Sequence, residues 1–324
     1  MTPLQFEELY QGEWQELGGL LRQILSGRNS TATSDPIRAD RVAVLYRRAC
    51  EHLALARARS YPPYLLDQLE QLTADAHQMV YQQRDFGLLK VRRFVTHDFP
   101  VSVRSMAGYI WTAAALLYIP SLVIGWLVYQ HPELILSVVS AETASSFDSM
   151  YSGSAESIGR AAEGDWLMFG YYISHNIGIA FQCFAGGLLA GIGTLFYLLY
   201  NGAFGGAIAG YITVRGHSGT FYPFIATHSA FELTAIVLCG AAGLKLGHAL
   251  VAPGRLSRTQ SLVAATQECV PVVAGSAVML LVAAAIEAFW SSQAWLAPGV
   301  KYAVASACWL AVLGYLTFQG RNAD

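Results

Sequence analysis

The chain has 324 residues, of which 54% are hydrophobic and only 13% are charged, whereas a soluble domain carries about 25% charged residues. This shortage of charge excludes an ordinary soluble globular protein. The formal net charge of −2 provides no overall basic field for nucleic acid, so we expect no nucleic-acid partner.

Residues 1–105 predict a cytoplasmic helical domain, because apolar side chains recur at helical spacing and thirteen of the twenty Lys and Arg residues lie there. Breaks at residues 27–34 and at Pro62 and Pro63 divide this region into three helices, the third running from Tyr64 towards Phe94. The N-terminus lacks the apolar core of a cleavable signal peptide, so we expect the first transmembrane helix to direct insertion.

The end of this region combines basic and aromatic side chains just before the first long apolar run. That pattern is typical of a segment lying on an anionic leaflet, although it also suits a plain cytoplasmic connector. The candidate membrane-surface residues are Lys90, Arg92, Arg93, Phe94, Phe99 and Arg104.

Residues 106–324 predict a transmembrane domain, which makes the fold an all-α polytopic membrane bundle of about six helices. The first span covers residues 106–129, and the acidic, Ser-rich residues 130–165 then form an outer loop. Residues 166–214 contain no Asp, Glu, Lys or Arg and are long enough for two spans. We expect these at 171–200 and 203–214, with an earlier turn near 191–193 as the alternative because the second span would be short.

Three further spans are predicted at residues 224–244, 270–290 and 300–318. Both termini then lie in the cytoplasm, together with seventeen of the twenty basic residues, as the positive-inside rule requires. Residues 216–228 form either an ordinary outer loop or a re-entrant segment. Five scattered cysteines without a CxxC spacing provide no disulfide or metal framework, so we interpret them as packing residues.

Small residues repeat every fourth position in two of the apolar segments. Such spacing lets helix backbones approach closely in lipid, which indicates a tight hairpin or a dimer contact, with a pore or hinge as the alternative. The glycines concerned are Gly187, Gly191, Gly202, Gly206 and Gly210.

Five polar residues fall within the predicted spans and, on this topology, all lie in the outer half of the membrane: His175, Asn176, His228, Glu232 and Glu287. His228 and Glu232 are four residues apart and share a helix face. Structural hydrogen bonding between helices is one interpretation, and a site for an ion, a proton or a lipid head group is another.

A zinc or di-metal site can also be written from these residues, but the His-Glu-x-x-His form is missing. We therefore expect no metal and no other cofactor. Phosphate-binding loops, dinucleotide fingerprints, nucleophile elbows and kinase motifs are also missing from the sequence, so we expect no catalytic residues and no enzyme activity.

The sequence resembles the stage II sporulation protein M family over about residues 40–317. The residues that carry the resemblance in the N-terminal region are Leu45 to Arg48, Leu53 to Arg57, Ala76, His77, Val80, Tyr81, and Phe99 to Arg104. In the membrane region they are His175, Asn176, Gly187 to Gly193, Asn201, Gly202, Gly206, His228 to Leu233, Gly243 and Gly247.

This resemblance implies a non-enzymatic scaffold or an envelope-remodelling component of the bacterial inner membrane. It also implies other membrane proteins or a MoxR-type ATPase as partners. We further expect membrane lipids as partners and, from the glycine spacing, a homo-oligomer (a dimer). A transporter or channel that uses the His and Glu residues is the alternative, and an intramembrane metal-dependent hydrolase is a third reading. A cavity around those side chains would favour the transporter or lipid site, whereas a sealed, fully hydrogen-bonded cluster would favour the scaffold.

Overall fold

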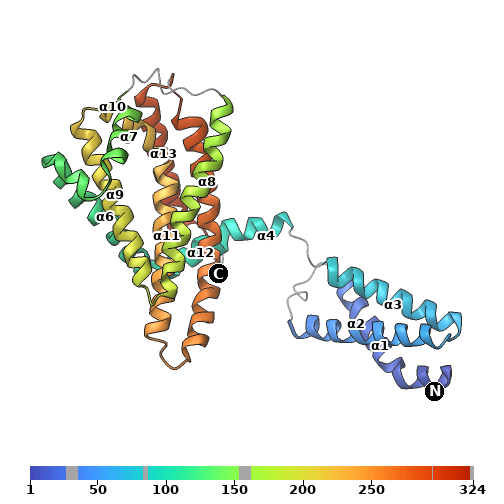
Figure 1. Ribbon diagram of the computed structural model, residues 1–324. Helices are drawn as coiled ribbons and strands as arrows, with labels where there is room; N and C mark the ends of the chain where they lie inside the picture. The colour runs from blue at the N-terminus through green and yellow to red at the C-terminus, as the bar shows by residue number, and fades with distance from the viewer. Residues whose placement is uncertain (27–35, 83–86, 153–161, 294, 322–324) are drawn as a thin grey trace. The chain divides into compact units, whose positions relative to one another are not determined.

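The computed structural model describes residues 1–26, 36–82, 87–152, 162–293 and 295–321 (Figure 1). These residues are helical and include no strand, which confirms the predicted all-α class. The chain divides into two compact units, Met1–Leu88 and Leu89–Asp324. The expected division at residue 105 therefore lies inside the second unit, because residues 99–105 pack against the membrane helices.

The first unit is a bundle of three helices, α1 (Pro3–Ser26), α2 (Pro36–Ala58) and α3 (Pro63–Gln82). Its interior holds two apolar clusters, one around Phe6 and Trp14 and the other around Leu17 and Leu45. The third helix ends at Gln82, earlier than the sequence predicts. Residues 83–86 lie outside the described part, and the next helix belongs mostly to the second unit.

The second unit begins with α4 (Leu88–Arg93), the π-helical turn η2 (Phe94–Asp98) and α5 (Phe99–Ser105). Long helices and short connecting helices follow it. They are α6 (Ala107–Gln130), η3 (Pro132–Ser137), α7 (Ala141–Tyr151), α8 (Ala162–Ala185), η5 (Gly186–Leu188), α9 (Ile192–Val214), α10 (Ser218–Ile225), α11 (Ser229–Val251), α12 (Arg258–Ile286), η6 (Glu287–Ser291) and α13 (Pro298–Phe318).

Figure 1 shows the long helices of this unit side by side, with α7 and α10 at one end and the connection between α11 and α12 at the other. Among the described residues, five helices are long and apolar enough to cross a membrane: α6, α9, α11, α12 with η6, and α13. The protein is therefore a multi-pass membrane protein. Helix α8 packs among these helices, but His175, Asn176 and Gln182 lower its hydropathy, so the sixth span stays a prediction.

The turn between α8 and α9 lies at residues 186–191, so the expected break at Asn201 and Gly202 is wrong and the earlier turn is confirmed. Gly191 adopts φ +85°, a left-handed conformation that glycine takes without a steric penalty and that reverses the chain here. Helix α9 consequently has 23 residues, enough for a full span. Residues 218–225 form the short helix α10, directly before His228 and α11. The predicted outer loop contains the helices η3 and α7, and its residues 153–161 lie outside the described part.

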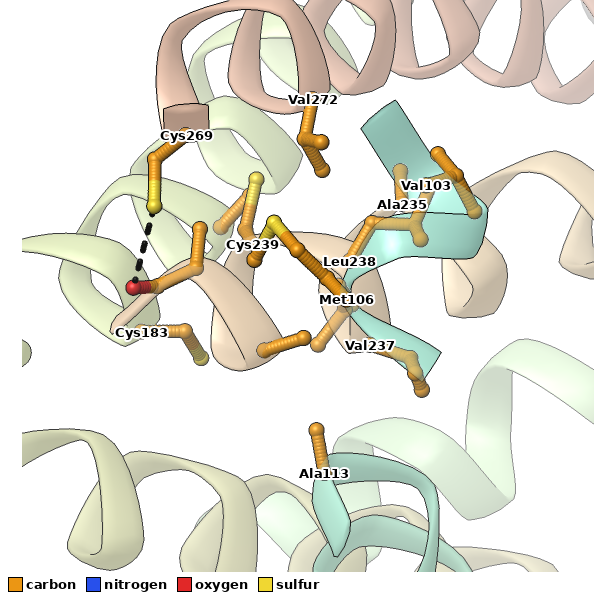
Figure 2. Close-up of a cluster of buried hydrophobic side chains, with 14 of the residues drawn as sticks. Val103, Met106, Ala113, Cys183, Ala235, Val237, Leu238, Cys239, Cys269 and Val272 are labelled. Atoms are coloured by element: carbon orange, nitrogen blue, oxygen red, sulfur yellow. Dashed lines mark hydrogen bonds between the residues drawn. The ribbon is translucent and has the colours of Figure 1, made fainter. Parts of the chain in front are cut away.

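Helix α11 provides most of the main core because its small residues let other helices pack closely around it. Figure 2 shows Cys239 and Leu238 of α11 facing Val272 of α12 and Val103 of α5. The thiol of Cys269 donates to the backbone oxygen of Ala242 at 3.7 Å. Cys183, Cys239 and Cys269 are buried free thiols inside this apolar cluster.

The five predicted glycines lie at contacts between helices of the same chain. A Cβ at Gly202 would overlap the backbone oxygen of Leu117 on α6, and one at Gly206 would overlap that of Ser121. Gly210 meets the backbone of α6 at Gly125 in the same way, while Gly187 and Gly191 lie against Gly243 and Gly247 of α11. These glycines therefore bring α9 onto α6, and the α8–α9 turn onto α11.

Candidate functional site

The second unit contains a cavity of about 490 Å³ between its long helices and the two short helices α7 and α10. Most of the wall is aromatic or aliphatic, contributed for example by Phe147, Phe204, Phe221 and Phe224. All five intramembrane polar residues singled out in the sequence line this same cavity: His175, Asn176, His228, Glu232 and Glu287.

Three of these residues bring their ligand atoms together. Suitable atoms of His228, Glu232 and Glu287 all lie within 4.8 Å of one another. His228 is the residue directly before α11, and Glu232 follows one turn later with its Oε2 3.9 Å from His228 Nε2. Glu287 comes from η6, a π-helical turn that extends α12. We call His228, Glu232 and Glu287 together the acidic cluster.

A second set of residues holds His228 in place. Its Nδ1 is 3.0 Å from the hydroxyl of Ser291, at the end of η6. The backbone oxygen of Ser291 in turn accepts a hydrogen bond of 2.8 Å from the amine of Lys301, which is 7% exposed. Thr227 completes the link by donating to the backbone oxygen of Lys301. These contacts join the start of α11, the turn η6 and the first turns of α13.

Sequence reasoning missed Ser291 and Lys301. Lys301 falls inside the predicted last span, residues 300–318, but belongs to none of the predicted sites. It is the only Lys or Arg within α13, and an isolated cation inside an apolar helix is a signal that could have marked it. Ser291 had no distinguishing sequence signal, because its role depends on a neighbour 63 residues away.

The two polar residues of α8 are placed differently. Asn176 is 2% exposed, and its Nδ2 has no hydrogen-bond partner although it belongs to a residue lining the cavity. His175 is exposed, and its ring stacks on that of Tyr171 with the ring centroids 5.6 Å apart. His175 therefore lines the cavity without joining the acidic cluster.

Four of the residues that line the cavity are exposed. The exposed residues that line it are Met150 of α7, Tyr171 and His175 of α8, and Gly205 of α9. Tyr171, His175 and Gly205 lie near the middle of their helices, at a depth where the surroundings of a membrane protein are lipid tails. The cavity therefore reaches the surface of the helix bundle at residues of α7, α8 and α9.

Helix α7 covers one side of the cavity with Phe147, Met150 and Tyr151. It is attached by Asp148, which accepts hydrogen bonds of 2.9 and 2.8 Å from the guanidinium of Arg215 and lies 3.0 Å from His217 Nε2. The Arg215 guanidinium holds the pKa of the Asp148 carboxyl below its usual range, and the His217 contact acts in the same direction. Sequence analysis identified neither partner of this contact.

The predicted membrane-surface residues separate into three groups. Lys90, Arg92 and Arg93 are exposed on or at the end of α4, beside exposed Leu89. Phe99 is instead 4% exposed, because its ring lies against Gly275 of α12, and Phe94 packs beside it. The guanidinium of Arg104 donates to the backbone oxygens of Leu316 and Gln319 at the end of α13. Phe99 and Arg104 thus anchor the segment to the membrane helices.

Fold and site together define a multi-pass membrane protein with a helical N-terminal unit. Its membrane unit contains a mostly apolar cavity that is also lined by a few polar side chains. The chain belongs to the stage II sporulation protein M family, whose profile matches residues 114–292. That range includes every residue that lines the cavity, from Leu117 to Glu287. Residues 4–82 match a domain of unknown function (DUF8413). No curated protein and no solved structure matches the chain.

Proposed function

We propose that this protein is a non-enzymatic lipid-binding component of the bacterial inner membrane, which takes the head group of a membrane lipid into its cavity. The single observation that carries the proposal is the placement of all five intramembrane polar residues around one cavity whose exposed lining residues lie on α7, α8 and α9. A sealed, hydrogen-bonded cluster would instead have supported a purely structural role.

The chemistry of the cavity suits an amphiphile. Aromatic and aliphatic side chains form most of its wall, while His228, Glu232 and Asn176 contribute buried or partly buried polar groups to it. A lipid that enters where the cavity reaches the surface can keep its tail against apolar side chains and bring its polar end to these groups. A small hydrophilic solute gains nothing from the aromatic wall, so the lipid is the better fit.

The proposed orientation of the protein in the membrane follows from the distribution of its charged residues. With the first unit in the cytoplasm, the positive-inside rule is satisfied and the cavity lies in the outer half of the bilayer. The lipid would then come from the outer leaflet. The protein would bind it, or pass it on, during remodelling of the envelope.

The test blocks the cavity opening without disturbing the helix contacts. A Cβ at Gly205 meets no atom within 4 Å, so Gly205→Phe places a ring at the opening. The matched control is Gly314→Phe on α13, another position with open space but outside the cavity. Each protein is reconstituted in nanodiscs of phosphatidylethanolamine and phosphatidylglycerol, and lipid retained after detergent release is counted by native mass spectrometry.

We expect the wild type and Gly314→Phe to retain phospholipid equally, and Gly205→Phe to retain several-fold less. Equal retention by all three proteins would refute the cavity as a lipid site. Size-exclusion chromatography checks that each variant is folded.

One observation favours a second role, the recruitment of a partner. The first unit has an apolar core of its own and exposes Leu4, Leu9 and Tyr64 on its surface. A second copy of the chain or a MoxR-type ATPase is the proposed partner, and the complex would act as a membrane scaffold. Pull-down with the full-length protein, comparing wild type with Leu4→Ser and Leu9→Ser, tests this role, and unchanged capture would contradict it.

A further inference from the structure

The acidic cluster has the donor atoms of a divalent metal site. One imidazole nitrogen and two carboxylate oxygens lie within 4.8 Å of one another, and all three groups are ordinary zinc ligands. Zinc bonds of about 2.0–2.2 Å place two ligands of one tetrahedral ion roughly 3.3 Å apart. A contraction of at most about 1.5 Å would therefore bring the three atoms around one ion.

His228 is oriented as a metal ligand would be. Its Nδ1 is hydrogen-bonded to Ser291, which leaves Nε2 directed towards Glu232, the nearest carboxylate oxygen being 3.9 Å away. Metal-binding histidines usually make such a contact through the nitrogen that does not coordinate. The hydrogen bond from Lys301 to Ser291 keeps the turn η6 in position, and π-helical turns within α-helices frequently occur at functional sites.

The chemistry of the cluster also suits a cation. Two carboxyl groups and one imidazole line the same cavity of the membrane unit. Among the described residues that line this cavity, none is Lys or Arg, and the Lys301 amine donates to a backbone oxygen of Ser291. A bound divalent ion would favour the charged form of the carboxylates, which burial away from water otherwise disfavours.

A second observation, independent of the acidic cluster, comes from Asn176. This side chain is 2% exposed and lines the same cavity, and its Nδ2 has no hydrogen-bond acceptor. Native proteins rarely leave a buried amide unpaired, because the loss of its hydrogen bonds to water is then not repaid. An oxygen atom carried on a bound ion is the kind of acceptor that this amide lacks.

We infer that His228, Glu232 and Glu287 bind one divalent transition-metal ion, with zinc the best match, through His228 Nε2 and one oxygen of each carboxylate. Three protein ligands leave a fourth position facing the cavity, open to water or to an oxygen of another molecule. The inference depends on the three side chains alone and does not require that the cavity binds lipid.

The test uses the full-length protein in detergent. Metal is removed with a chelator, Zn²⁺ alone is added back, and bound zinc is measured by mass spectrometry and calorimetry. The variants Glu232→Gln and Glu287→Gln keep the side-chain shape but remove the charged ligand. Glu268→Gln is the control, because Glu268 pairs with Lys245 and lies outside the cavity.

We expect about one zinc ion per chain in the wild type and in Glu268→Gln, and at least tenfold weaker binding in the two cluster variants. Zinc should also raise the Tm of the wild type and leave that of Glu287→Gln unchanged, which separates loss of the site from loss of the fold. Equal zinc binding by all four proteins, or none by the wild type, would overturn the inference. Lipid is absent from this assay, so its outcome is independent of the nanodisc experiment.

Discussion

Neighbouring glycines of α9 occupy different surroundings, and single residues therefore decide how closely α6 and α9 pack. Gly206 lies where a Cβ would overlap the backbone of Ser121, whereas Gly205 is exposed and has no atom within 4 Å of a Cβ. Of these two neighbours, Gly206 is therefore needed for the close approach of the two helix backbones and Gly205 is not. The sequence pattern of glycines predicts close packing in general, but it does not identify which helix is the partner.

Gly206→Ala should destabilise the membrane unit, while Gly205→Ala should leave it unchanged. The added methyl group at Gly206 forces α6 and α9 apart, and overpacking of this kind costs about 1–3 kcal/mol. Thermal unfolding of both variants in detergent measures the difference as a lower Tm for Gly206→Ala alone. If the two variants unfold at the same temperature, the α6–α9 contact is not as close as described.

At the scale of elements, α7 covers one side of the cavity, and a charged contact at Asp148 helps to hold it there. Its side chains Phe147 and Met150 line the cavity, and Asp148 on the same helix attaches it to Arg215 and His217. The folded-state pKa of Asp148 lies below its usual value. Its contribution to docking is therefore complete above the unfolded pKa of about 4 and is lost as the pH falls through the folded pKa.

Asp148→Asn should loosen α7 at neutral pH, and acid should loosen the wild type in the same way. Hydrogen exchange of residues 141–151, followed by mass spectrometry, should be about tenfold faster in Asp148→Asn than in the wild type at pH 7. Glu142→Gln, which changes an exposed carboxylate of the same helix, is the control and should exchange like the wild type. A slow rate in Asp148→Asn would show that apolar packing alone holds α7.

At the scale of the whole molecule, the two units differ in the surface that they expose, and each surface suits a different solvent. The membrane unit exposes apolar side chains along its long helices, whereas the first unit buries its apolar side chains in two clusters and pairs charges on its surface, as in Arg41 with Glu16 at 2.7 Å. Inside the first unit, Trp14 Nε1 donates to His52 Nδ1 at 3.1 Å. Burial lowers the pKa of His52, while nearby glutamates act weakly in the opposite direction.

Residues 1–88 should fold alone as a soluble three-helix bundle that acid destabilises. Because His52 is held neutral in the folded state, the unfolded state binds more protons between the folded pKa and about 6.5, so stability falls as the pH is lowered through that window. Circular dichroism should show a lower Tm at pH 5 than at pH 7. His52→Asn keeps an acceptor for Trp14 and removes the titration, so its Tm should change less. An equal change in both proteins would assign the acid effect to other groups.

The sequence alone determines the membrane class, the helical first unit and the approximate spans, because these depend on hydropathy and on the length of a helix across a bilayer. It also places His228 and Glu232 on one face, because four residues make about one helical turn. Only the tertiary structure brings Glu287, Asn176 and Ser291 to His228, encloses them in a cavity and assigns Phe99 to the core. These contacts join segments far apart along the chain, and the local pattern of residues does not determine which helices pack together.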